Sequence, residues 1–374
     1  MKEEKRREEI PLVVHVSRTS LAGAPIRIVK ALNKYTNFQA RLVNFSANKL
    51  KSGENVFDED LTWDKNKEEV LELFKNADII HFHHWFDLKF NPFLIDFNKI
   101  CKPTCKFLRH FHSDRYFLNK TEIRFAELIE KDSLPKIVIP HYPERTFMNY
   151  PIVPNIMPIF DKEYLPNNVK NDRVKVLFSA SHGRSMYEFR WATKGYEQVS
   201  QKLKELSSKY DFEYVEIFGK TFKEIMKLKS ESDIIIGDIV TGSYHLTELE
   251  GLSLGKPVLT WLDGRSISTF MNAFKTKEVP FVNVSLQELD DVLIELVQDR
   301  KLQKNIGKYS RNWIEKYYRE EDLIKEFSKI YSELLTTGKI TKRENSERYI
   351  NAKEFLNNRL YDIKWEQRCK DRKI

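Results

Sequence analysis

The sequence predicts an α/β protein with two Rossmann-like domains, each built on a parallel sheet. Short apolar segments alternate with amphipathic segments through both halves of the chain, a pattern typical of parallel strands joined by right-handed helical crossovers. The length of 374 residues also fits two domains better than one. A polar stretch with a proline and paired asparagines at 161–172 indicates a linker, so the two domains would face each other across a cleft.

We therefore expect a first domain over 1–160, a linker over 161–172, and a second domain over 173–320. Residues 321–374 would form a helix that crosses back to the first domain, followed by a basic tail. In the first domain, strands are expected at 12–16, 40–45, 78–85, 106–111 and 136–139, with helices from Pro25 and at 67–74. In the second, strands are expected at 174–179, 212–218, 233–239, 258–262 and 280–284, with helices from Thr193, at 222–228, at 243–254, at 269–274 and from Leu286.

Composition narrows the possible classes of function. No apolar run approaches the ~20 residues that cross a bilayer, and residues 1–9 mix both charge signs, unlike a signal peptide. Three cysteines in 374 residues fit a reducing cytoplasm. The net charge is +8, and 339–374 holds 11 Lys and Arg against 6 Asp and Glu, a net +5. No recognised nucleic-acid module is evident, so we expect no nucleic-acid partner.

The first strand leads into a loop, 17–25, that suits ligand binding. Pro25 fits the first turn of the helix that follows, and Gly23 allows the backbone to approach a ligand. The loop is neither Gly-x-Gly-x-x-Gly nor a P-loop, which argues against the NAD and ATP folds.

Histidines gather near the ends of two strands in the first half. The strand 78–85 ends in three histidines and Trp85, and alternation places His81 and His83 on one face and His84 on the other. This spacing disfavours a ready-made zinc triad, even with the two histidines that follow at 110 and 112. His112 emerges at the carboxyl end of its strand, where open parallel sheets bind ligands. His110 competes for that role, and a structural histidine bonded to a backbone carbonyl is the remaining alternative.

A basic loop joins the first strand and helix of the second half. Arg184, Arg190 and Lys194 cluster where the chain reaches a helix N-terminus, so cationic side chains and backbone N–H groups can meet one anion. The residues alone do not decide which arginine is the partner of Lys194.

The helix at 243–254 carries a carboxylate on its apolar side. Gly255 suits the left-handed C-cap, and Pro257 starts the strand that follows. At about 100° per residue, Glu250 falls inside the leucine arc while Glu248 falls outside it. A carboxylate there must be paired or hydrogen-bonded; the alternative is a helix edge from which Glu250 reaches solvent. Gly251 is small, so the helix can lie close to its neighbours.

This segment carries a family resemblance. Residues 250–258, Glu-Gly-Leu-Ser-Leu-Gly-Lys-Pro-Val, resemble the Glu-Ala-Met-Ala-x-Gly-x-Pro-Val signature of GT-B glycosyltransferases, in particular the retaining family-four enzymes. The resemblance implies that Glu250 binds the ribose of a nucleotide-sugar donor. The family's first glutamate corresponds to Gly242 here, and Ser243 and Tyr244 are candidates to replace its contact with the donor sugar.

Other segments extend the resemblance over about residues 10–335. The family's first loop resembles Ala22–Pro25 around Gly23, its Phe-His-Ser step resembles 111–113, and its Lys-Gly pair resembles Lys194-Gly195. These matches imply that His112 acts near the donor sugar and that Lys194, with Arg184 or Arg190, holds the diphosphate. His83 and Trp85 would lie on the acceptor side.

The resemblance implies transfer of a sugar from a nucleotide-diphosphate donor to a hydroxyl of a glycan, lipid-linked or small-molecule acceptor, with retained configuration. The sequence shows no Asp-x-Asp motif, so we expect no metal, and no cofactor either, because the nucleotide-sugar is a substrate. The alternatives are an epimerase-like enzyme on the same fold and a binding protein without turnover. The tail 339–374 would contact an anionic membrane surface from the cytoplasm, or its aromatic residues would pack on the first domain.

Overall fold

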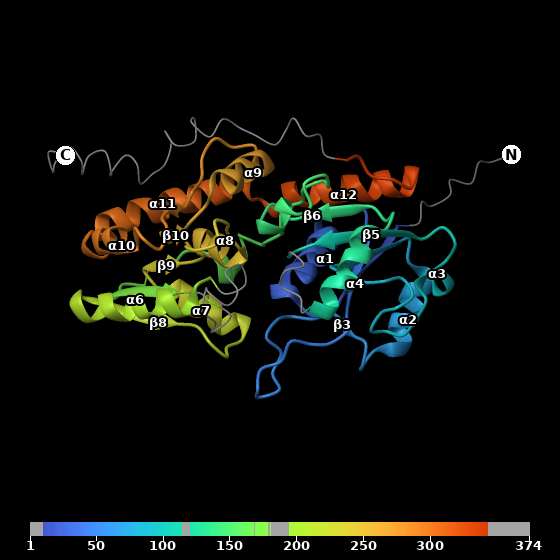
Figure 1. The fold of residues 1–374 in the computed structure, drawn as a ribbon, viewed down its shortest axis with the longest axis horizontal. Helices are drawn as coiled ribbons and strands as arrows, with labels where there is room; N and C mark the ends of the chain where they lie inside the picture. Colours follow the sequence, from blue (N-terminus) through green and yellow to red (C-terminus); the bar gives the residue numbers. More distant parts are fainter. Residues whose placement is uncertain (1–9, 114–119, 168, 179, 181–193, 343–374) are drawn as a thin grey trace. The chain divides into compact units, whose positions relative to one another are not determined.

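The computed structural model describes residues 10–113, 120–167, 169–178, 180 and 194–342. These residues form two compact units, each organised around a parallel sheet (Figure 1). The first unit contains the chain up to Asn48, Phe57–Val138 and Glu321–Lys342, and the second contains Lys49–Val56 and Ile139–Glu320. The predicted pair of parallel-sheet α/β domains is therefore confirmed.

The first unit has a six-stranded sheet in the order β3-β2-β1-β4-β5-β6, and all neighbouring strands are parallel. The chain order reverses between β1 and β4, and ligands of open α/β sheets bind outside the carboxyl ends of strands at such a point. The strands are β1 (Leu12–Ser17), β2 (Gln39–Asn44), β3 (Leu61–Thr62), β4 (Ile79–His83), β5 (Lys106–Phe111) and β6 (Lys136–Val138). The helices are η1 (Leu21–Gly23), α1 (Ala24–Tyr35), α2 (Lys67–Asn76), α3 (Phe97–Ile100), α4 (Lys120–Glu130) and α12 (Glu320–Thr337).

The two faces of this first sheet differ in chemistry. One face packs valine, isoleucine and phenylalanine side chains against the apolar residues of α2 and α3. The other face carries buried histidines from β1, β4 and β5 and is covered by Phe327 and Tyr331 of α12. Helix α12 thus belongs to the first unit although it follows the second in the chain, as predicted. None of the helices that the structure describes is long and apolar enough to cross a membrane.

The second unit has a five-stranded parallel sheet in the order β11-β10-β9-β7-β8, which reverses between β7 and β9. Its strands are β7 (Val174–Phe178), β8 (Phe212–Glu216), β9 (Ile234–Ile236), β10 (Val258–Thr260) and β11 (Val282–Asn283). Its helices are η3 (Tyr142–Arg145), η4 (Lys162–Tyr164), α6 (Tyr196–Lys209), α7 (Phe222–Glu231), α8 (Leu246–Ser253), α9 (Gly264–Phe274), α10 (Leu289–Gln298) and α11 (Arg300–Tyr317).

Several helix boundaries differ from the sequence-based expectation. Helix α9 begins at Gly264 rather than at 269, because Asp263 caps it by accepting a hydrogen bond from the N–H of Ser266, and α8 begins at Leu246 rather than at 243. Helix α6 begins at Tyr196 with Gly195 as its N-cap, whereas the expected cap, Thr193, lies outside the described residues. The expected single helix from Leu286 is two helices, because Asp299 ends α10 and caps α11 by accepting a 2.7 Å hydrogen bond from the N–H of Leu302.

Residues 139–172 pack with the second unit, so the division by packing falls at Val138–Ile139, ahead of the stretch expected to be the linker. The buried hydroxyl of Tyr318 donates to the carbonyl of Asn155, and the guanidinium of Arg311 donates to the carbonyls of Ile159 and Tyr164. These hydrogen bonds from α11 and its C-terminal end tie the incoming chain to the second unit.

Helices α8 and α11 approach each other at two glycines, which gives a stability test. Gly255 is left-handed (φ 68°), as expected, and directly follows Leu254, the C-cap of α8; a Cβ on Gly307 would lie only 2.0 Å from the carbonyl oxygen of Gly255. Because that neighbour is backbone, we expect Gly307→Ala to destabilise the protein by at least about 1–3 kcal/mol in urea unfolding. In Gly264→Ala the new Cβ meets nothing within 4 Å and should cost little. Equal stabilities of the two variants would contradict the close packing.

Candidate functional site

Polar groups converge at the switch point of the second sheet, between the carboxyl ends of β7 and β9. After β9 the chain continues through Gly237 and Asp238, and the loop that leaves β7 returns at Lys194. The carboxylate of Glu248, in the first turn of α8, accepts a 2.7 Å hydrogen bond from the N–H of Asp238 and lies 3.4 Å from the Lys194 ammonium. A Cβ on Gly237 would lie 2.1 Å from that carboxylate, so this approach requires glycine.

Glu248 is completely buried, and the expectation that it lies outside the buried side of α8 is wrong. Helix α8 begins at Leu246, so Glu248 is at the third helical position and reaches back to accept a 2.9 Å bond from the N–H of His245. Burial alone would raise the pKa of Glu248, but the positive charges of Lys194 and His245 lower it overall. The carboxylate is therefore an ionised partner for Lys194.

Asp238 is the second buried carboxylate of this site. One oxygen accepts bonds from the N–H groups of Val240 and Thr241, and the other accepts from the Thr241 hydroxyl and from His245 Nε2 at 3.1 Å. Burial opposes ionisation, but the hydrogen bond and charge of His245 keep the pKa of Asp238 low. The carboxylate fixes the orientation of His245, whose side chain is about one-third exposed.

Lys194 is in an unusual backbone conformation. It has a left-handed φ of 51°, and Gly195 follows at 63° as the N-cap of α6. Two successive left-handed residues turn the chain sharply into the first turn of α6, where N–H groups and the helix dipole favour anions. Lys194 therefore combines an ammonium group with a helix N-terminus at the sheet's switch point. The predicted partners, Arg184 and Arg190, lie outside the described residues.

The predicted residues before α8 lie in the interior. Ser243 and Tyr244 are fully buried, and their hydroxyls have no hydrogen-bond partner among the described residues. The Tyr244 ring packs 4.2 Å from that of His141, between centroids. Gly242 has a φ of 81°, and a Cβ there would lie 3.1 Å from the carboxylate of Asp263, so this position strongly disfavours a glutamate.

Glu250 is buried, as its place in the leucine arc predicts, and the alternative in which it reaches solvent is wrong. Its carboxylate forms a 2.5 Å ion pair with Lys229 of α7, which is itself only 1% exposed. The two glutamates of α8 thus face different lysines: Glu250 contacts Lys229, and Glu248 contacts Lys194.

In the first unit, Gly23 and Trp85 both take part in the packing of their loops. Gly23 is left-handed (φ 75°) and caps α1, with Pro25 in the first turn as expected; a Cβ on it would lie 3.2 Å from the Phe57 ring. Trp85 is buried, and its indole N–H donates a 3.0 Å hydrogen bond to Glu130. Its ring stacks on that of His84.

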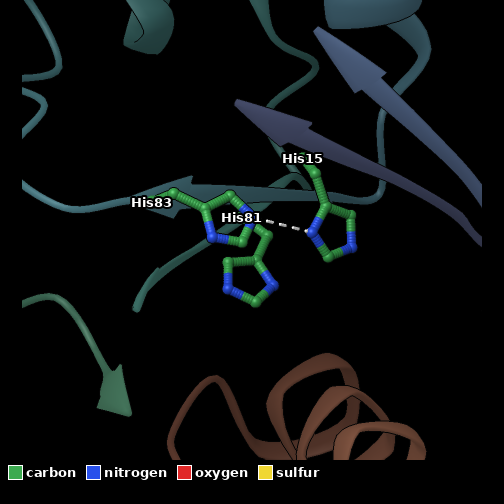
Figure 2. A group of neighbouring side chains, drawn as sticks. All are labelled: His15, His81 and His83. Carbon is green, nitrogen blue, oxygen red and sulfur yellow. Dashed lines mark hydrogen bonds between the residues drawn. The ribbon is translucent and has the colours of Figure 1, made fainter. Parts of the chain in front are cut away.

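The histidines of the first unit form a connected group. Half-buried His112 follows β5, and its Nε2 lies 2.8 Å from Nδ1 of His83. Nε2 of His83 in turn lies 3.0 Å from Nδ1 of His15 on β1 (Figure 2). His81 and His83 share a face, as alternation predicts, and stack at an interplanar angle of 11°.

The sequence analysis weighed the three histidines at the end of β4 together with His110 and His112, but not His15. Among the described residues, two triads have nitrogens within 4.8 Å of one another: His15, His81 and His83, and His83, His110 and His112. The pairing of β1 with β4 and of β4 with β5 brings them together, because His15 lies opposite His81 and His83 lies opposite His110.

Several site residues escaped the sequence analysis although weak signals exist. His15 is the only histidine in a strand that is apolar from Leu12 to Val16 apart from it. Asp238 directly follows a run of isoleucines and a glycine, and His245 directly precedes a helix. Each is a polar residue inside a strand, shortly after a strand, or directly before a helix.

No family model and no curated protein matches this sequence. Solved structures do match. HepE from Anabaena, in a complex with UDP and glucose, superposes with a TM-score of 0.57 at 13% identity, covering 87% of this chain and 100% of HepE. The protein has the GT-B fold.

Two further solved structures have a similar fold. A glycosyltransferase from Rickettsia africae matches with a TM-score of 0.55 at 13% identity, over 87% of this chain and 99% of its own. A sucrose-phosphate synthase from Thermosynechococcus elongatus matches at 0.53 with 12% identity, over 87% and 99%. At these identities the likeness establishes the GT-B fold and leaves the reaction to be argued from the site.

Proposed function

We propose that this protein is a glycosyltransferase that moves a sugar from a nucleotide-diphosphate donor to an acceptor hydroxyl. The observation that carries the proposal is the position of Lys194, at the β7–β9 switch point beside the N-terminus of α6. Parallel sheets bind ligands there, and an ammonium group with helix N–H groups suits a diphosphate. HepE, a protein of similar fold, binds UDP and UDP-glucose.

The proposed mechanism stabilises the leaving group with protein cations. As the glycosidic bond breaks, negative charge grows on the diphosphate, and Lys194 with Arg184 or Arg190 would stabilise it without a divalent metal at the phosphates. Glu250 would bind the ribose, and Ser243 and Tyr244 would contact the donor sugar. Their hydroxyls, which have no hydrogen-bond partner within the described part of the chain, support this role, because buried polar groups normally have partners.

In the first unit, the proposal assigns His112 to the donor sugar and His83 and Trp85 to the acceptor side. The support is the place of His112 at the carboxyl end of β5 and its hydrogen bond to His83. The configuration of the transferred sugar would be retained. The acceptor would be a glycan, a lipid-linked sugar or a small molecule.

A panel of UDP-, GDP- and ADP-sugars tests the function. One donor class should raise the melting temperature, since a ligand at 100 times its Kd adds about 2.7 kcal/mol of stability. With a sugar or lipid acceptor present, the same donor should then release nucleoside diphosphate. Epimerisation of the bound donor without an acceptor would favour the epimerase-like alternative. Donor binding without any turnover would favour a nucleotide-sugar-binding protein that is not an active enzyme. No stabilisation by any donor would contradict nucleotide-sugar binding.

We further propose that the basic tail holds the enzyme at an anionic membrane surface on the cytoplasmic side. Residues 343–374 lie outside the described residues, so the support is their sequence: a basic excess beside Phe355, Tyr361 and Trp365. The full chain should sediment with anionic liposomes, with each basic residue near the surface contributing about 1 kcal/mol at low salt.

The liposome experiment has a matched truncation. Helix α12 ends at Thr337, and the hydroxyl of Thr341 still donates to Glu333, so a chain that stops after Lys342 keeps all the described contacts. This truncation should abolish sedimentation while the melting temperature stays unchanged. If the full chain does not sediment with the liposomes and truncation lowers the melting temperature, the tail has a structural role instead.

A further inference from the structure

We propose that His83, His110 and His112 form a binding site for a divalent transition metal ion, with zinc as the natural probe. The three residues come from the carboxyl ends of adjacent strands β4 and β5, and their nitrogens lie within 4.8 Å of one another. In a tetrahedral site with bonds of about 2.0–2.1 Å, the donor atoms lie about 3.4 Å apart. Small side-chain rotations would therefore bring the three nitrogens to one ion.

His110 provides the second observation. It is completely buried, and neither of its ring nitrogens has a hydrogen-bond partner among the described residues. Leaving a buried polar side chain unpaired costs free energy, and coordination of one nitrogen to an ion would remove part of that cost. Its ring centroid lies 4.0 Å from that of His112, so it faces the proposed site.

Contacts with His15, Tyr331 and His81 bear on the orientation of His83, one of the proposed ligands. Nε2 of His83 lies 3.0 Å from Nδ1 of His15, and Nε2 of His15 lies 3.3 Å from the Tyr331 hydroxyl, which is 2.7 Å from Nδ1 of His81. Two opposite directions of donation satisfy all three contacts, and metal coordination requires the one in which His83 donates to His15, His15 to Tyr331, and the phenol to His81. His83 then carries its proton on Nε2, and the lone pair of Nδ1 faces His112. Ligating histidines are usually held this way by a hydrogen bond to the other nitrogen.

Access to solvent favours the triad of His83, His110 and His112 over the triad of His15, His81 and His83. His15, His81 and His83 are all fully buried, whereas His112 is half-buried and opens the outer group to solvent. Three imidazoles suit Zn²⁺, Co²⁺, Ni²⁺ or Cu²⁺, and water would complete the coordination.

This site is built from residues of the first unit alone, and its existence does not depend on the proposed function. One corollary does rest on that function. The ion would occupy a ring nitrogen of His112, the residue that the proposed function assigns to the donor sugar, so zinc should inhibit transfer. Zinc binding without inhibition would remove only the catalytic role of His112.

The test is calorimetry of the tag-free full-length chain, stripped of metal by chelator dialysis and titrated with Zn²⁺. We expect one strong site per chain, and tetrahedral Co²⁺ bands when Co²⁺ replaces Zn²⁺. His112→Ala, chosen because His112 is half-buried, and His110→Ala should each weaken zinc binding by at least about a hundredfold. His15→Phe should weaken it by about 10–100-fold, as expected when the partner of a ligating histidine is lost.

His245→Ala is the matched control, because it removes a part-exposed histidine from the other unit and should leave zinc affinity unchanged. Circular dichroism of each variant checks that the protein is folded, and His112→Gln supplies a second variant if His110→Ala unfolds. The absence of a stoichiometric site in the wild-type protein would overturn the proposal. So would equal zinc affinity of the wild type and a folded His112 variant.

Discussion

Replacing Lys194 with alanine should lower turnover by about a hundredfold or more, comparable with the loss of one oxyanion donor. The ammonium lies beside the N-terminus of α6 and 3.4 Å from the buried carboxylate of Glu248, which orients it. Charge on a leaving diphosphate grows in the transition state, so kcat should fall as well as kcat/KM. Steady-state kinetics with the donor found in the screen would measure both.

Lys202→Ala is the matched control for this prediction. Lys202 lies on α6, the helix that follows Lys194, and pairs with Asp290 of α10, so its loss should change kinetics little. Full activity of Lys194→Ala would contradict the assignment, and so would a strict requirement for a divalent metal in transfer. Because Lys194 is a partner of Glu248, melting temperatures of both variants must be compared before kinetics are interpreted.

Glu250→Gln should destabilise the protein by up to about 3–5 kcal/mol and also weaken donor binding. The change leaves the Lys229 ammonium buried without its carboxylate, and an uncompensated buried charge is costly. If Glu250 also binds the ribose, donor affinity falls for a separate reason. Urea unfolding and calorimetry with the nucleotide measure the two effects independently.

Lys229→Gln separates the two roles of Glu250. It breaks the same ion pair but keeps the glutamate, so it should destabilise the fold while donor affinity stays closer to that of the wild type. Equal losses of affinity in the two variants would assign Glu250 a structural role only. Glu248→Gln, which the helix arc alone would predict to be nearly silent, is no inert control, because Glu248 holds Asp238, His245 and Lys194.

Local sequence determined the elements and their order. The strand expected at 106–111 is β5 with the same limits, and the end of α8 follows from a glycine that takes the left-handed conformation. Alternation placed His81 and His83 on one face, and the leucine arc placed Glu250 inside. These features depend on the period of a strand or helix, which can be read over a few residues.

Tertiary structure alone decided which of these side chains meet. His15 joins His83 only because β1 pairs with β4 in a sheet whose order reverses there, and Tyr331 reaches them from a helix more than 300 residues from His15. Glu250 and Glu248 are two residues apart, yet one pairs with α7 and the other with Lys194, because a first-turn glutamate can bend back to the helix start. Long-range pairing and side-chain direction set these contacts, and neither leaves a periodic pattern in the sequence.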